Sequence, residues 1–253
     1  MSAKPDFESV PALWAQMRGD PVRAGEREEA FALVGCLVMS GEVLDRLRQL
    51  LAASPWLCGV EDSSRSSPLM LAASMGHEKC LELMVAFAHP LDWLSVGGPL
   101  RSSALALAAN ADRSGKCARI LAPRSNLLHL DAWGRSAAMI AAYYGDAAFL
   151  AEAINGSDPL ATDKDGLDLL GCAARSGVLA CCDLALARLD REGGEALLER
   201  STRASSMARA QGLLLVAERI KALSLALWEA RELGGSMAQE PARREACTRS
   251  GRI

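Results

Sequence analysis

The sequence predicts an all-α fold, an α-solenoid built from repeated helix-turn-helix units. Three observations support this prediction. Half of the 253 residues are hydrophobic but only 4% are aromatic, with alanine and leucine replacing the β-branched and aromatic residues that large sheets need. A pattern of a capping residue, an Ala-Ala pair and, in three of four copies, a glycine recurs every 32 to 36 residues. A second apolar stretch with helical spacing follows each copy.

The first helix of each unit is expected to start after a residue type that caps helix N-termini. The four capping positions are Ser67, Ser103, Ser136 and Asp168. An alanine pair five and six residues later is small enough for neighbouring units to pack closely. Gly76, Gly145 and Gly177 then supply the left-handed conformation that ends a helix. In the second copy a longer turn, Asn110 to Lys116, takes the place of the glycine.

The second helix of each unit is indicated by apolar residues at helical spacing. In the first copy these are Cys80, Leu81 and Met84, and in the next they are Cys117 and Ile120. The two cysteines take the same place in successive units, which is typical of a packing position. We therefore expect free, buried thiols in a reducing compartment rather than a disulfide framework.

The repeat resembles the ankyrin repeat, which has a period of ~33 residues and the signature T-P-L-H-x-A-A-x-x-G. The turns before two caps match the ankyrin finger, namely Asp131-Ala132-Trp133-Gly134 and Asp163-Lys164-Asp165-Gly166. The copies depart from the family at the usual histidine, where Met70, Ala106, Met139 and Gly171 stand. The second copy also lacks an acidic finger residue. We expect a less rigid stack than a consensus array forms.

Weaker copies flank the four central repeats, as expected for the terminal repeats of a solenoid. The first would comprise helices over 31–40 and 43–53, and the last would comprise helices over 205–211 and 213 to about 233. The resemblance thus implies an ankyrin-repeat domain over residues 29–233. Residues 1–28 would form a polar leader with one short helix around Trp14, and residues 234–253 a disordered basic tail. The tail arginines are Arg243, Arg244, Arg249 and Arg252.

Composition also excludes several classes of function. The net charge of −3 and the pI near 5.7 give no general attraction for nucleic acid or an anionic membrane surface. No apolar run reaches the ~18 residues that span a bilayer, and the first residues lack the pattern of a secretory signal. We expect a cytoplasmic protein, with the nucleus, entered by diffusion, as the alternative compartment.

No catalytic site, metal site or cofactor is predicted. Of the three histidines, His77 follows a helix-ending glycine, where the resemblance to ankyrin repeats implies a structural role. His89 and His129 have no Cys or carboxylate neighbours at ligand spacing. Nucleotide-binding and hydrolase motifs are absent from the sequence. The vicinal pair Cys181-Cys182 suggests redox chemistry, but one member of such a pair in a helix usually faces the core. We therefore predict that the protein is not an enzyme.

The resemblance implies a concave groove, formed by the fingers and the first helices, that binds another protein. The residues expected there are those between the alanine pair and the glycine, with the variable finger residues and their neighbours. The predicted contact residues are Trp133, Tyr143, Tyr144, Arg135, Arg175, Lys164, Met75 and Arg113. Trp, Tyr and Arg are enriched at interface hot spots. We expect an acidic or aromatic-bearing segment of a partner protein as the ligand.

Two other functions remain open at this stage. In one, the chain is an adaptor or regulatory subunit whose tails bring an enzyme to the ligand in the groove. In the other, an enzyme active site lies on the solenoid, and the missing catalytic constellation argues against it. Deleting the tails and testing for turnover by the pure protein would separate these hypotheses.

Overall fold

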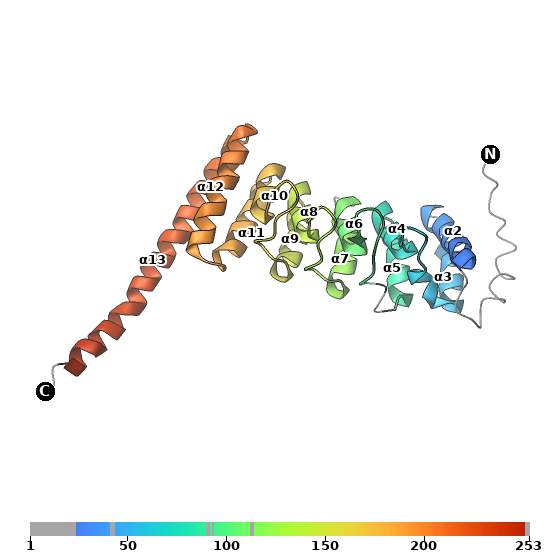
Figure 1. Ribbon diagram of the computed structural model, residues 1–253, viewed down its shortest axis with the longest axis horizontal. Helices are drawn as coiled ribbons and strands as arrows, with labels where there is room; N and C mark the ends of the chain where they lie inside the picture. Colours follow the sequence, from blue (N-terminus) through green and yellow to red (C-terminus); the bar gives the residue numbers. More distant parts are fainter. Residues whose placement is uncertain (1–23, 41–43, 90–91, 93, 112–113, 251–253) are drawn as a thin grey trace. The chain divides into compact units, whose positions relative to one another are not determined.

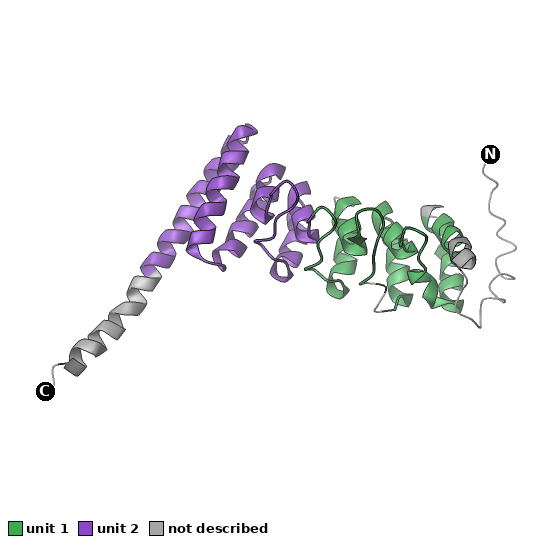
Figure 2. Ribbon diagram, viewed as in Figure 1, with its two compact units in different colours: residues 1–133 green, residues 134–253 purple. Residues whose placement is uncertain are grey.

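The computed structural model describes residues 24–250, with the exception of 41–43, 90–91, 93 and 112–113 (Figure 1). The described residues are mostly helical with very little strand. The predicted fold class, an all-α repeat solenoid, is confirmed. The chain divides into two compact units, Met1–Trp133 and Gly134–Ile253 (Figure 2), and each has a buried apolar core.

Unit 1 is a double layer in which first helices lie beside first helices and second helices beside second helices. Helix α4 lies against both α2 and α6, and α5 lies against both α3 and α7. Its elements are α2 (Ala24–Ser40), α3 (Leu44–Ala53), η1 (Pro55–Gly59), α4 (Pro68–Met75), α5 (Glu78–Phe87), β1 (Val96–Gly97), β2 (Ser102–Ser103), α6 (Ala104–Ala111), α7 (Lys116–Leu121) and η2 (Ala122–Arg124). Fully buried leucines, among them Leu47, Leu69, Leu81 and Leu105, fill the space between the helices.

Unit 2 repeats the double layer. Helix α10 lies against α8 and α12, and α11 lies against α9 and α13. Its elements are α8 (Ala137–Tyr144), α9 (Ala147–Ala153), η3 (Ile154–Gly156), α10 (Leu169–Ser176), α11 (Leu179–Asp190), α12 (Gly194–Ala210) and α13 (Leu214–Ser250). Phe149, Leu150 and Leu186 are fully buried in its core.

All four predicted caps are confirmed. Each side chain accepts a hydrogen bond from the backbone N–H three residues further along and is itself buried. The bonds run from Met70 N to Ser67 Oγ (3.2 Å), from Ala106 N to Ser103 Oγ (3.2 Å), from Met139 N to Ser136 Oγ (3.1 Å) and from Gly171 N to Asp168 Oδ1 (2.7 Å). A cap of this kind typically contributes about 1 kcal/mol. The helices therefore start where the local sequence chemistry places them.

The predicted helix-ending glycines are also confirmed. Gly76, Gly145 and Gly177 have φ of 69°, 78° and 77°, a region that L side chains rarely adopt. At Gly145 a Cβ would lie only 2.6 Å from Val178 Cγ2, so close packing requires glycine as well. In the second copy, Gly115 (φ 66°) takes the left-handed conformation just before α7, within the predicted longer turn.

The finger of the second copy differs from the sequence-based expectation because it contains a pair of short strands. Val96 pairs with Ser103 and Gly97 with Ser102 in antiparallel register. Strands of two residues are too short to give an alternating pattern that a sequence could reveal. Gly97 is required there, since a Cβ would lie 1.7 Å from the carbonyl oxygen of Arg65.

The flanking helices are longer than predicted. Helix α2 starts at Ala24 rather than Phe31, and α12 starts at Gly194 rather than Ser205. Helix α13 continues to Ser250, beyond the predicted end near Leu233. The stretches added to α2 and α12 are rich in Glu, Ala, Leu and Arg, which have high helix propensity. Propensity therefore extends these two helices where no repeat signature marks their starts. The stretch added to α13 contains Gly234, Gly235 and Pro241, so propensity does not explain it.

The end of the chain gives a first testable prediction. The sequence has no apolar periodicity after Leu233, and a helix without packing partners is only marginally stable in water. Residues 234–253 should therefore be sensitive to limited trypsin digestion, with cleavage after Arg243 and Arg244, while residues 29–233 persist within a compact fragment. Mass spectrometry of the fragments would show this. Cleavage after Arg243 and Arg244 that is as slow as cleavage in the repeats would contradict the prediction.

Candidate functional site

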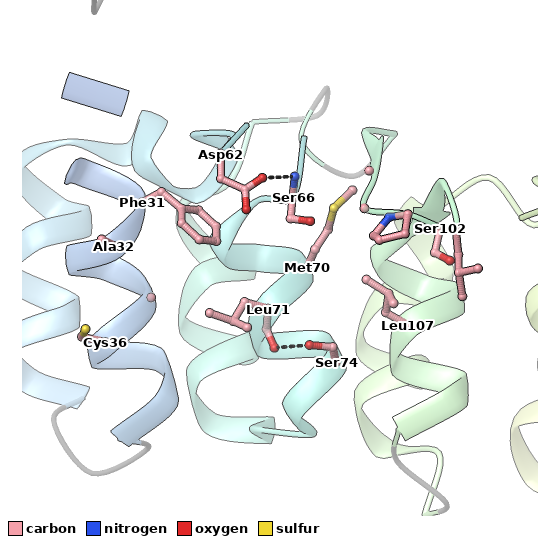
Figure 3. Close-up of a pocket in the computed structure, with 15 residues that line it drawn as sticks. Phe31, Ala32, Cys36, Asp62, Ser66, Met70, Leu71, Ser74, Ser102 and Leu107 are labelled. Carbon is pink, nitrogen blue, oxygen red and sulfur yellow. Dashed lines mark hydrogen bonds between the residues drawn. The ribbon is translucent and has the colours of Figure 1, made fainter. Parts of the chain in front are cut away.

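A cavity of about 550 Å³ opens on the first-helix side of unit 1 (Figure 3). This volume lies in the range of ligand-binding pockets in proteins. Helices α2, α4 and α6 and the first two fingers form its walls. The apolar lining residues are Phe31, Ala32, Met70, Leu71, Pro99, Leu100 and Leu107, and the polar ones include Asp62, Ser66, Ser74 and Ser102. We call this cavity the unit-1 pocket.

Three glycines form part of the wall of the unit-1 pocket. Gly35 of α2 and Gly97 and Gly98 of the second finger all line it. A Cβ on Gly35 would contact Leu71 Cδ2 at 3.4 Å, so any larger side chain there would project into the space between α2 and α4. Gly97 has no room for a side chain at all, since a Cβ there would lie 1.7 Å from the carbonyl oxygen of Arg65.

Several polar groups of the unit-1 pocket are already engaged within the protein. One carboxylate oxygen of Asp62 accepts hydrogen bonds from the Ser64 N–H (2.9 Å), the Ser64 hydroxyl (2.7 Å) and the Ser66 N–H (2.8 Å). The Ser74 hydroxyl donates to the Leu71 carbonyl at 2.9 Å. What the pocket offers a ligand is therefore mainly apolar surface, which suits apolar side chains.

Two arginines with left-handed backbone conformations stand in the fingers beside the pocket. Arg65 has φ of 64° and Arg101 has φ of 47°, and each directly adjoins a lining residue, Ser66 and Ser102. The conformation costs a non-glycine residue roughly 1–2 kcal/mol. The corresponding residues of the next two fingers are Gly134 and Gly166. Both arginines are exposed, and Arg65 forms an ion pair with Glu61 at 3.7 Å.

Trp133 lies in the third finger, the last element of unit 1. Its N–H donates to Asp131 Oδ1 at 2.9 Å, and its side chain is 46% exposed. The neighbouring Ala132 N–H donates to the carbonyl of Leu100 at 2.7 Å. Because Leu100 lines the unit-1 pocket, the third finger is tied by its backbone to the pocket wall.

The other two predicted contact residues of unit 1 are less informative. Met75 is the last residue of α4 and is 49% exposed, but it does not line the unit-1 pocket. Arg113 lies outside the described residues.

Unit 2 brings together three of the predicted contact residues. The rings of Tyr143 and Tyr144 meet edge to face with centroids 5.3 Å apart, and the Arg175 guanidinium lies 5.5 Å from the Tyr143 centroid. All three side chains are exposed. Arg135 and Arg175 both lie close enough to Cys172 for their positive charges to favour its thiolate, which opposes the larger effect of burial on the pKa of this thiol. Lys164 is exposed on its finger.

Sequence reasoning missed most of the unit-1 pocket. Phe31, Met70, Leu71, Pro99 and Leu107 were not among the predicted contact residues. Leu71 and Leu107 each stand directly before an alanine pair, and this shared apolar position was the available signal. The glycines in the cavity wall carry no chemical signature in a sequence.

The described cysteines have the properties of core residues. Cys36 is half-buried and the other six are buried. Burial, with smaller effects of nearby acidic groups, raises the pKa of Cys181 to about 11 and the pKa of Cys182 to about 12. Both thiols are fully buried, whereas only one was expected to face the core. A raised pKa disfavours the reactive thiolate, so the vicinal pair is poorly suited to redox chemistry.

This environment predicts slow reaction with thiol reagents. Burial and the nearby Asp163 and Asp168 raise the pKa of Cys172 from 9.0 to about 12, which lowers its thiolate fraction about a thousandfold at neutral pH. Cys80, Cys117 and Cys172 should therefore stay unlabelled in native buffer, even at pH 9, and react on unfolding. Mass spectrometry after timed labelling measures this, with the half-buried Cys36 as internal reference. Rapid native labelling of all three would show that they are not core residues.

The described part of the chain contains no group of three His, Cys, Asp or Glu side chains that would hold a metal ion. Among the same residues, no helix combines the length and the hydrophobicity needed to cross a membrane.

Comparison with known families agrees with this architecture. The ankyrin-repeat family model matches residues 65–92, the segment that includes α4 and α5 of unit 1. The structure and this match together define a helical repeat solenoid that contains an ankyrin repeat, and the resemblance read from the sequence is confirmed. No curated protein matches the chain.

Proposed function

We propose that the chain is a non-catalytic protein-interaction module whose unit-1 groove, formed by α2, α4, α6 and the first three fingers, binds a segment of a partner protein. Ankyrin repeats are in general protein-protein interaction modules. A groove built on packed helices binds with little ordering cost, because its geometry exists before the ligand arrives.

The unit-1 pocket is the observation that carries this proposal. Its volume of about 550 Å³ suits one or two large apolar side chains, and burial of such side chains is the main favourable term in association. The hydrogen bonds of Asp62 and Ser74 leave few polar groups to bind a charged small molecule. Trp133, tied to the pocket wall through Ala132 and Leu100, would extend the contact surface along the fingers.

A non-catalytic role is supported by the state of the reactive side chains. The pKa of Cys58 is raised to about 12, mainly by burial and also by Asp92, and the thiols of unit 2 are similarly disfavoured as nucleophiles. A general base and a nucleophile would need to lie within hydrogen-bond reach of each other. The residues that line the unit-1 pocket include Cys36 but no histidine that would act as its base.

A second candidate function is that of an adaptor with two ligands. It is favoured by the exposed cluster of Tyr143, Tyr144 and Arg175 in unit 2, which has the composition of an interface hot spot. In this version, the unit-1 groove takes one segment and the unit-2 cluster takes another. Alanine at both tyrosines should then abolish binding of one ligand only.

The experiment that tests the proposal is selection from a displayed library of random peptides against the full chain. Wild type should enrich peptides that share large apolar residues. Leu107→Trp, which fills the unit-1 pocket from α6, should lose them. Leu128→Trp is the matched control, because Leu128 is 63% exposed in a loop of the same unit. The proposal fails if no family of peptides is enriched, or if both variants retain it equally.

A further inference from the structure

One wall of the unit-1 pocket is formed by the helix that follows directly on the N-terminal segment of the chain. Phe31, Ala32, Gly35 and Cys36 of α2 all line the cavity, and α2 starts at Ala24. The segment before it contains a run of apolar residues, Val10, Leu13, Trp14 and Met17, whose spacing is that of one face of a helix. An apolar pocket and an apolar segment thus adjoin in the same chain.

We infer that residues 6–17 are an intramolecular ligand of the unit-1 pocket, so that a partner segment binds only by displacing them. This inference rests on the proposed function, since it names the regulation of the same groove. Trp14 and Leu13 are the side chains of this segment that enter the pocket.

The chain is long enough for this contact. A helix rises 1.5 Å per residue, so Phe31 lies about 10 Å along α2 from Ala24. The nine residues between Trp14 and Ala24 span up to roughly 30 Å when extended. The connection is therefore longer than the distance that Trp14 must cover to reach the cavity, provided that the chain turns back along α2.

The charges of the segment complement one basic residue of the groove most directly. Asp6 and Glu8 precede the apolar run, and Arg65 and Arg101 stand in the fingers at the groove's edge with exposed side chains. Arg65 also forms an ion pair with Glu61 at 3.7 Å and Asp62 lines the pocket, so Arg101 is the main basic group for the acidic residues of the segment. The structure retains arginine at these two positions despite the cost of a left-handed backbone. A local outlier of this kind is the sort that is kept for function, and here the function would be to attract acidic residues that flank an apolar anchor.

Tethering makes a weak contact sufficient. A short flexible connection gives an effective concentration on the order of millimolar. If the intrinsic dissociation constant of the segment is about tenfold lower than this concentration, the segment fills the pocket about nine-tenths of the time. A competing partner would then bind about tenfold more weakly than to an empty pocket, because apparent affinity scales with the fraction of competent protein.

The first experiment places a photo-cross-linking amino acid, p-benzoylphenylalanine, at position 14 of the full chain. Irradiation of dilute protein should give adducts within one chain, on peptides that contain Met70, Leu71 or Leu107. The same amino acid at Gln16, on the opposite face of a helix, is the control and should give few of these adducts. Combining position 14 with Leu107→Trp should remove them. Adducts only at other sites, or only between two chains, would overturn the inference.

The second experiment measures the affinity of a peptide selected by the full chain. Leu13→Asp/Trp14→Asp should bind that peptide about tenfold more tightly than wild type, and the control Ala12→Asp/Gln16→Asp should not differ from wild type. Equal affinity of all three proteins would overturn the inference while leaving the groove as a binding site. Adducts at Met70 together with a failed peptide selection would instead support the intramolecular contact and refute the proposed function.

Discussion

Replacing Ala142 with leucine is expected to lower the free energy of unfolding by about 1–3 kcal/mol, the usual cost of overpacking a filled core. Ala142 is fully buried in α8, and α8 lies against α10, which carries its own buried pair Ala173 and Ala174. Three additional carbons in such a position force the helices apart. Equilibrium unfolding in urea, followed by circular dichroism, measures the change.

Ala148→Leu provides the matched control, since it makes the same substitution at an exposed position of the neighbouring helix α9. Its effect should stay within about 0.5 kcal/mol, as for most surface changes. Equal stability of Ala142→Leu and wild type would mean that the alanine pairs are not the close-packing positions of the repeat.

The parts of the fold that were predictable from sequence depend on local chemistry. A serine or aspartate that caps a helix, and a glycine that ends one, act through hydrogen bonds and backbone angles within a few residues. Ser136 and Gly145 therefore mark α8 in the sequence as clearly as in the structure. The alanine pairs add a packing signal, since only small side chains allow helices to approach closely.

The parts that were not predictable depend on contacts between distant segments or on residues without a distinctive side chain. The strand pair of Val96–Gly97 with Ser102–Ser103 is held partly by the first finger, through the bond from Gly98 N–H to Ser64 O. Asp62 organises that finger, but Arg65 stands at the position where the third and fourth fingers have glycine. The first finger therefore lacks the acid–turn–glycine signature in the sequence.

The candidate site was predicted only in part for a related reason. Large exposed aromatic residues such as Trp133 and Tyr143 are conspicuous in a sequence, and the structure leaves both substantially exposed. A cavity, in contrast, is lined by residues from distant segments, and Gly35, Gly97 and Gly98 meet only in the folded unit. Exposed aromatic contact residues are therefore easier to predict from a sequence than a pocket that receives the side chains of a ligand.

Replacing Trp133 with alanine is expected to weaken binding of a selected peptide by about 2 kcal/mol or more, the loss typical of a tryptophan hot spot, or about thirtyfold in Kd. Trp133 is 46% exposed, so a ligand that covers it gains from burying apolar surface. Its finger is held in place by backbone bonds, Trp133 N–H to Asp131 and Ala132 N–H to Leu100, which the substitution leaves intact. Isothermal titration measures the change in Kd.

The stability of Trp133→Ala decides how that loss is interpreted. Because the side chain is far from fully buried, the free energy of unfolding should change by less than about 0.5 kcal/mol. Trp56→Ala is the control for binding, since Trp56 is 38% exposed in η1 of the same unit and does not line the unit-1 pocket; its Kd should equal that of wild type. Unaltered peptide binding by Trp133→Ala together with a large loss of stability would make Trp133 a packing residue. The ligand would then be held by the unit-1 pocket alone, and the contact surface would end at Leu100.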